Sequence, residues 1–289
     1  MAAPTAPTQA TLLREALDQS NSIEKYARAR DEWFPQILRD MASRRDWKVL
    51  EASAVVLLTE NKPAVNLPSD YSRWLQFVLY WGTDGLAQAG AVGSMTLAAD
   101  ESASVEDVEG RYCIIVGGTG SGQHRTSTVY DTSTKIATPD ENWTTAPAAS
   151  SQYVIGTQWR RMDITFLENQ ELGSKPGVPD SWTEYNGQIV WNRPPDETVV
   201  AGILKYYMDI DKMDLTSADM TEIYARWRNP ILHKLKYFCW MEKGDARAMG
   251  EDAAYERDVL TAARLDERQR RGRRTFKFRS IGGMPVQGY

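Results

Sequence analysis

The stretch WKVLEASAVVLLT at residues 47–59 decides the fold, because the spacing of the apolar residues changes there. Before Asp46, apolar side chains recur every three to four residues, which is typical of helices that face a core. Within the stretch they alternate, which predicts a strand with one apolar face. That face consists of Leu50, Ala52, Ala54, Val56 and Leu58. The chain is therefore expected to pass from helical to β structure at this point.

Residues 11–46 are expected to be helical, after a flexible leader at 1–10 that is rich in Ala, Pro and Thr. Asn21, with Glu24 three residues later, predicts the cap of a second helix. Pro35 inside that helix should kink or split it. The first helix has an apolar face of Leu12, Leu13, Ala16 and Leu17, and the second has one of Ile23, Tyr26, Trp33, Phe34, Ile37, Leu38 and Met41.

Residues 47–208 predict an antiparallel β domain of sandwich or barrel-like form. The part at 82–176 is rich in Gly, Ser and Thr, and we interpret it as an elaborated insertion. The strand candidates are short, alternating and separated by turn signals. After the first stretch they read RWLQFVLYW, RYCIIV, RTSTVYD, YVIGTQW, MDITFL, QIVW and VVAGILKYYMDI.

Residues 209–272 are expected to return to helices. Ser217 would cap a short helix, and the Asn-Pro pair at 229–230 would start a second one. Gly244 should end this second helix, and Asp245 should cap a long polar helix. The whole pattern predicts an α+β fold with a helical bundle core, the β domain inserted between the N-terminal and C-terminal helices, and an extended basic arm.

That arm, residues 273–289, belongs to a segregated charge pattern. Residues 268–289 carry seven basic side chains and no acidic one, and the formal charge of −5 for the chain leaves −12 for the first 267 residues. Charge blocks of this kind are usually interaction tails. A basic tail could bind nucleic acid, but the acidic body favours an acidic protein partner. Phe276 and Phe278 alternate with Lys277 and Arg279, as in a segment that adds to a neighbour's sheet edge.

The glycine-rich stretch GGTGSGQH at 117–124 has the spacing of a phosphate-binding loop. Gln123 and His124 stand where that loop needs Lys and a hydroxyl residue, and RTSTVYD follows in place of a helix. We therefore predict the tip of a hairpin between two strands. The residues expected to contact a neighbouring subunit or a tail protein are Gly118, Gly120, Gly122, Gln123, His124 and Arg125.

Other chemical motifs are weak. The acidic run DIDKMD lacks the glycine and glutamate of a calcium-binding loop, and the two histidines, His124 and His233, are far apart. Cys113 and Cys239 lie in apolar runs, which predicts buried free thiols. We expect no catalytic residue, no metal, no cofactor and no enzyme activity. The sequence also lacks a long apolar run and signal-peptide features, so synthesis in the cytoplasm without a membrane anchor is expected.

Two regions resemble the head-to-tail adaptor (connector) proteins of tailed bacteriophages. The first runs from YARARDEWF through Trp47 to AVVLL and continues in LPSDYSRW. The second includes YNGQIVWNRPPDETVVAGILKYYMDIDKMDL, followed by YARWRNPILHKLKYFCWMEKGDARAMGEDAAYERDVLTAAR. The chain departs from the family at 82–176, which is longer than a minimal adaptor needs.

The resemblance implies a structural virion protein of the neck, the head-tail interface. It would form a homo-oligomeric ring of about twelve copies that docks under the portal protein. The ring would link the portal to a tail-side neck or nozzle protein and leave a DNA channel without sequence-specific binding. The helix at 245–271 would line or brace the ring. Contacts to the portal or a neighbouring subunit would come from Arg273, Arg274, Phe276, Lys277, Phe278, Arg279, Ile281, Met284 and Tyr289.

An alternative from another class is a carbohydrate-binding or carbohydrate-active β domain with helical flanks. It depends on aromatic side chains expected at the surface, namely Trp143, Tyr153, Trp159 and Trp182. The competing interpretation places these aromatics in the core or in an interface.

Overall fold

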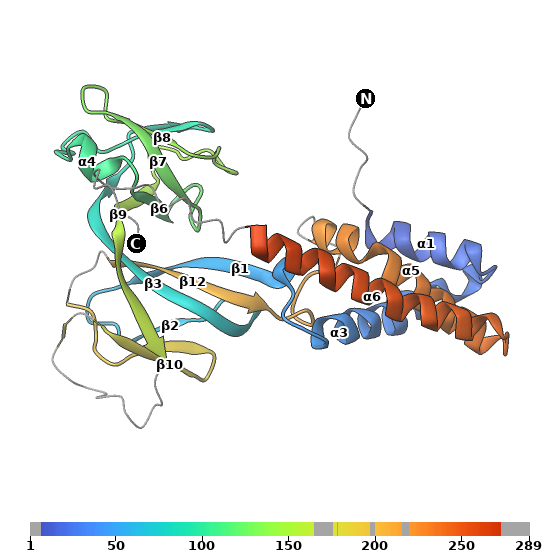
Figure 1. The fold of residues 1–289 in the computed structure, drawn as a ribbon. Helices are drawn as coiled ribbons and strands as arrows, with labels where there is room; N and C mark the ends of the chain where they lie inside the picture. Colours follow the sequence, from blue (N-terminus) through green and yellow to red (C-terminus); the bar gives the residue numbers. More distant parts are fainter. Residues whose placement is uncertain (1–6, 165–175, 178, 197–199, 216–219, 273–289) are drawn as a thin grey trace, which may run out of the picture. The chain divides into compact units, whose positions relative to one another are not determined.

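The computed structural model describes residues 7–164, 176–177, 179–196, 200–215 and 220–272. The chain forms two compact units, one from Met1–Leu50 with Ile210–Tyr289 and the other from Glu51–Asp209. These boundaries lie close to residues 47 and 208, where the sequence changes character. The predicted α+β class is confirmed, with a curled sheet in one unit and helices in the other (Figure 1).

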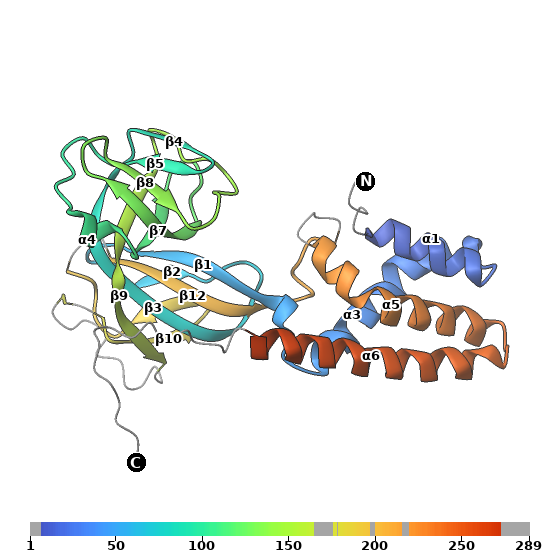
Figure 2. The same ribbon diagram turned by 45° about the horizontal axis from the view of Figure 1, so that its top comes forward.

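Among its described residues, the helical unit contains four helices of ten residues or more (Figure 2). Within this unit, α1, α3 and α6 each contact α5. The elements are α1 (Gln9–Gln19), a 3₁₀ turn (Ile23–Lys25), α2 (Tyr26–Arg28), a π turn (Ala29–Trp33), α3 (Phe34–Ser43), a second 3₁₀ turn (Lys48–Leu50), α5 (Thr221–Glu242) and α6 (Arg247–Gly272).

The predicted apolar face of α1 is confirmed, because its four residues are all buried. The predicted cap at Asn21 is wrong. Asn21 adopts a φ of +52°, and the N–H of Ser22 donates to the carbonyl oxygen of Leu17 (2.8 Å). Asparagine tolerates this left-handed conformation, so Asn21 terminates α1, and Ser22 precedes the next turn.

Pro35 splits the second helical segment, as predicted. The π turn lies directly before α3, and Pro35 occupies the first turn of α3, where its missing N–H costs no hydrogen bond. Most of the predicted apolar stripe is buried, including Trp33 and Phe34. Ile23 is an exception with 54% of its surface exposed, because it lies in the 3₁₀ turn.

The expected helix boundary at residues 229–230 is wrong, because α5 continues through Pro230. The cap expected at Ser217 lies outside the described residues. Trp227 and Ile231 are buried on the two sides of Pro230, so one continuous apolar face offsets the hydrogen bond that proline removes. Gly244 follows the end of α5 with a φ of +65°, as predicted, and the Oδ1 of Asp245 accepts the N–H of Arg247 (2.9 Å), as a capping residue does.

The β unit is one branched sheet that curls into a half-barrel (Figure 1). Its main strand order is β1-β12-β3-β9-β6-β7-β8-β5-β4, and β10, β11 and β2 branch from β9. The strands are β1 (Glu51–Leu58), β2 (Ala64–Asn66), β3 (Tyr71–Leu86), β4 (Ala89–Ala91), β5 (Ser94–Thr96), β6 (Tyr112–Gly117), β7 (His124–Asp131), β8 (Ile136–Pro139), β9 (Gln152–Ile164), β10 (Ser181–Tyr185), β11 (Gln188–Trp191) and β12 (Val200–Met208), with the short helix α4 (Val105–Val108) before β6.

Among the described residues, the sheet is antiparallel, as predicted, except at one pair. Strands β9 and β10 run parallel, with Ser181 opposite Asp163. A parallel pair requires a connection long enough for the chain to come back before the second strand begins, and the residues between Ile164 and Ser181 are numerous enough for this.

Two of the three apolar clusters that the described residues of the β unit form lie in regions that the sequence singled out. One lies on the face of β1 that the alternation predicted, with Val56 and Leu58 buried and Phe77 stacked on Trp191 at 5.5 Å. The other draws all its residues from between Ala87 and Ile155. The stretch interpreted as an insertion thus contains a core of its own.

The long strands β3 and β9 connect the regions around the two cores. At their crossing, Gly82 pairs with Gly156. A Cβ on Gly82 would lie only 1.8 Å from the carbonyl oxygen of Ile155, so the two backbones approach more closely than any side chain allows.

Candidate functional site

The glycine-rich stretch is the tip of a hairpin, as predicted. β6 and β7 pair antiparallel, with Ile114 opposite His124, so the loop leads into a strand and not into a helix. Gly118, Gly120 and Gly122 have φ values of +73°, +82° and +93°, which explains why three glycines occur here.

The side chain of Gln123 holds this tip against another loop of the same unit. Its Nε2 donates to the carbonyl oxygens of Gly120 and Thr145, both at 3.0 Å. Its Oε1 accepts the N–H groups of Thr144 (2.7 Å) and Thr145 (3.1 Å). Gln123, expected to contact a partner, is thus used to position the loop.

Arg125 and His124 also face their own unit. Arg125 donates to the carbonyl oxygens of His124 (2.8 Å) and Asn142 (3.3 Å) and lies over the ring of Trp143. Burial, and next the charge of Arg125, lower the pKa of His124, so the imidazole is neutral at pH 7. The outward surface of the tip is formed by its glycines and by Thr119 and Ser121. These two hydroxyl residues were not among the predicted contact residues.

A pair of substitutions measures how tightly the tip is fixed. A Cβ on Gly118 would lie 2.1 Å from the carbonyl oxygen of Ser150, whereas one on Gly122 meets nothing within 4 Å. Gly118→Ala should therefore lower the free energy of unfolding by about 3 kcal/mol. Gly122→Ala should cost about 1 kcal/mol, from its positive φ alone. Urea unfolding of both variants checks this, and equal losses would contradict the described packing of the tip on Ser150.

Three of the four aromatic side chains of the carbohydrate alternative are buried. Trp143 is 3% exposed, and Tyr153 and Trp182 are fully buried. The expectation of exposed aromatics is thus wrong for these three residues, because they fill two apolar cores of the β unit. The side chain of Trp159 lies outside the description.

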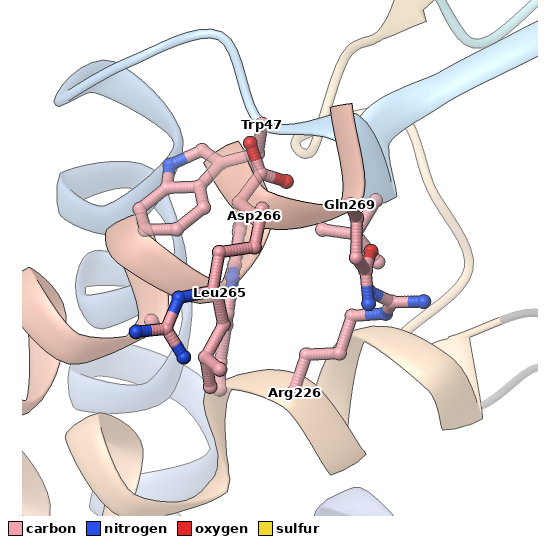
Figure 3. A pocket seen from close by; sticks show the side chains of 9 residues that line it. Trp47, Arg226, Leu265, Asp266 and Gln269 are labelled. Atoms are coloured by element: carbon pink, nitrogen blue, oxygen red, sulfur yellow. The ribbon is translucent and has the colours of Figure 1, made fainter. Parts of the chain in front are cut away.

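The helical unit contains an open pocket of about 240 Å³ between α5 and α6. Figure 3 shows Leu265, Asp266 and Gln269 on one helix and Arg226 on the other, with Trp47 beside them. The pocket is mainly apolar and has basic residues at its rim. Its complete lining is Trp47, Val49, Arg226, Trp227, Ala262, Leu265, Asp266, Arg268 and Gln269.

Asp266, one wall of this pocket, joins α6 to the segment that leads into the β unit. Its side chain is 6% exposed. Its Oδ1 accepts the N–H of Lys48 (2.8 Å), and its Oδ2 accepts from Arg270 (3.1 Å) and lies 3.6 Å from Arg45. Asp266 and Arg270 thus form an ion pair one turn apart on α6.

The two faces of α6 differ from those of an ordinary surface helix. One face is buried through Ala248, Tyr255 and Val259. A second stripe, about 110° away around the helix, leaves large apolar side chains in solvent, with Met249 81% and Leu260 60% exposed. A helix that presents apolar side chains on two faces is typical of a helix with a second partner.

The other chemical features of the described residues add no further candidate site. No three His, Cys, Asp or Glu side chains in the described ranges gather as metal ligands. Cys113 and Cys239 are free and buried, as predicted, and burial raises the pKa of Cys113 to about 12. Among the helices that the structure describes, none has the length and apolarity to cross a membrane. All nine arm residues predicted to contact a partner, from Arg273 to Tyr289, lie outside the described residues.

No family model and no curated protein matches the chain. The functional assignment therefore depends on the features of the chain itself, which include the exposed apolar stripe of α6 and the pocket on the other flank of that helix.

Proposed function

We propose that the protein is a structural component of the tailed-bacteriophage neck, an adaptor ring that docks under the portal and links it to the tail. The order of elements that resembles the adaptor family motivates this proposal. In it, the helices form the bundle that packs around the ring, and the β unit provides the contacts to the tail side. The glycine tip, with Thr119 and Ser121 exposed, would be one of those contacts.

The observation that carries the proposal is the exposed apolar stripe of α6. Met249 and Leu260 lie eleven residues apart, and eleven residues are close to three helical turns, so both side chains point in one direction. Arg264 follows on the same side, four residues after Leu260. An apolar and basic stripe of this kind suits side-by-side packing against another copy in a ring, where each copy uses two different surfaces.

The charge segregation suits a ring through which DNA passes. The first 267 residues carry a formal charge of −12, and like charge weakens adhesion to phosphates. The basic arm would be the exception, with the portal or a neighbouring subunit as its partner.

Assembly on purified portal particles tests the proposal. Leu260→Glu should reduce the number of copies bound per portal at least tenfold, because a charge would enter the apolar contact between copies. Thr261→Glu is the matched control, since this exposed neighbour points about 100° away on the same helix. Native mass spectrometry counts the copies, and circular dichroism verifies folding. Equal incorporation of the two variants would remove α6 from the interface, and no binding of the unaltered chain would contradict the adaptor role.

A further inference from the structure

The pocket between α5 and α6 is an open, mainly apolar site at the surface. Its floor is made by Trp47 and Trp227, whose rings meet edge to face at 5.4 Å, and both side chains are 1% exposed. Leu265 stands at the opening and is 54% exposed. Apolar surface left open in this way favours an occupant, because covering it releases water.

The size of the pocket favours a side chain over a free small molecule. Its volume of about 240 Å³ is below the range of roughly 300–1,000 Å³ typical of small-molecule sites. Aromatic floors of this kind commonly receive an aromatic or aliphatic anchor from a peptide segment.

We propose that Phe276 of the chain's own C-terminal arm occupies this pocket in the free protein. The proposal concerns the unassembled chain, so it does not depend on the portal or on the adaptor role.

The position of the pocket favours the arm as its occupant. Leu265 lies seven residues before the end of α6 at Gly272, a distance of about 10 Å along the helix. The four residues from Gly272 to Phe276 can span about 13 Å when extended. Glycine at a helix end permits the chain to reverse its direction. Phe276 can therefore reach the level of Leu265, while residues farther along the arm run past it.

Of the two arginines that line the pocket, Arg226 is held by neighbours within the helical unit. Arg226 forms an ion pair with Glu222 and donates to the Oε1 of Gln269 at 2.5 Å. In an extended segment, alternate side chains point to opposite sides. With Phe276 directed into the pocket, Thr275 and Lys277 would face the opposite side, and Arg274 and Phe278 would share the side of Phe276.

This placement has a consequence for the arm. Phe276 and Phe278 would otherwise add exposed aromatic surface to a segment that also carries four basic residues between 273 and 279 after the helix. Sequestering Phe276 covers part of that surface until a stronger partner displaces it. Burial of one phenylalanine is worth about 2 kcal/mol, which makes the contact easy to reverse.

Limited trypsin digestion tests the contact, because the bond after Lys277 lies next to the proposed anchor. Ala262 lines the pocket, so Ala262→Trp should fill the space and exclude Phe276. We expect this bond to be cut at least tenfold faster in Ala262→Trp and in Phe276→Ser than in the unaltered chain. Thr261→Trp, with the same new side chain one position earlier on α6, should leave the rate unchanged.

The result also distinguishes the chain's own arm from that of another copy. Protection by the chain's own arm does not vary with protein concentration, whereas protection by a second copy increases with it. Identical cleavage rates in all four proteins, or protection that disappears on dilution, would overturn the proposal. Mass spectrometry of early fragments measures the rate at this bond alone.

Discussion

Replacing Asp266 by alanine is expected to lower the free energy of unfolding by about 3 to 5 kcal/mol. The substitution leaves the N–H of Lys48 without its acceptor and removes the nearest carboxylate of Arg45, whose Nε is already buried without a partner. Buried polar and charged groups that lose a partner cost their full desolvation. Far-UV circular dichroism during urea unfolding measures the loss.

Asp252→Ala on the same helix is the matched control. Asp252 also forms an ion pair, with Lys234 at 2.6 Å, but its side chain is 42% exposed. Exposed pairs contribute little, so the expected loss is below about 1 kcal/mol. If the two variants were equally stable, Asp266 would not be the joint between α6 and the segment around Lys48.

The second large effect is expected at Gly82, where β3 and β9 approach most closely. Its Cβ would lie 1.8 Å from the oxygen of Ile155 and 2.6 Å from the Cα of Gly156. Both neighbours are backbone atoms, so they cannot move aside as a flexible side chain would. Gly82→Ala should therefore force the strands apart and lower the free energy of unfolding by about 3 kcal/mol or more.

The same substitution at Gly250 should act in the opposite direction. Gly250 lies within α6, and a Cβ there meets nothing within 4 Å. Alanine should stabilise the helix by roughly 0.5–1 kcal/mol, because glycine loses more backbone entropy on folding. Thermal unfolding of both variants gives the signs. A stabilised Gly82→Ala protein would show that the two strands do not meet as described.

Local patterns were enough to predict much of the fold. The alternation after Asp46 identified the buried face of β1, and the apolar spacing around Ala16 identified the buried face of α1. The glycine loop was identified as a hairpin tip because β-branched residues follow it where a nucleotide site needs a helix. In each case the signal lies within about ten residues of the chain.

The errors occur where distant parts of the chain decide the outcome. The Asn-Pro pair predicts that a helix starts at Pro230. However, α5 is continuous there, because apolar side chains are buried on both sides of Pro230. The sequence predicts separate strands for YVIGTQW and MDITFL. Pairing with the long strand β3 joins them into one strand, β9. These outcomes depend on tertiary contacts, which local propensity does not contain.

The candidate site was harder to predict than the fold. Gln123 and Arg125 looked available for a partner, because nothing in the sequence places residues 142–145 beside them. The pocket between α5 and α6 was not anticipated either. It brings Trp47 together with Trp227 and Leu265, which lie much later in the chain. Helical periodicity marks the buried face of α6, and only the packed helices show which apolar side chains remain uncovered.

The most direct test of the adaptor proposal is an electron cryomicroscopy reconstruction of the neck of the virion with this chain traced in it. The proposal predicts a ring of about twelve copies directly below the portal, with α6 of each copy against the next and the segment 273–289 contacting the portal or a neighbour. A neck without this chain, or copies of it elsewhere in the particle, would contradict the proposal.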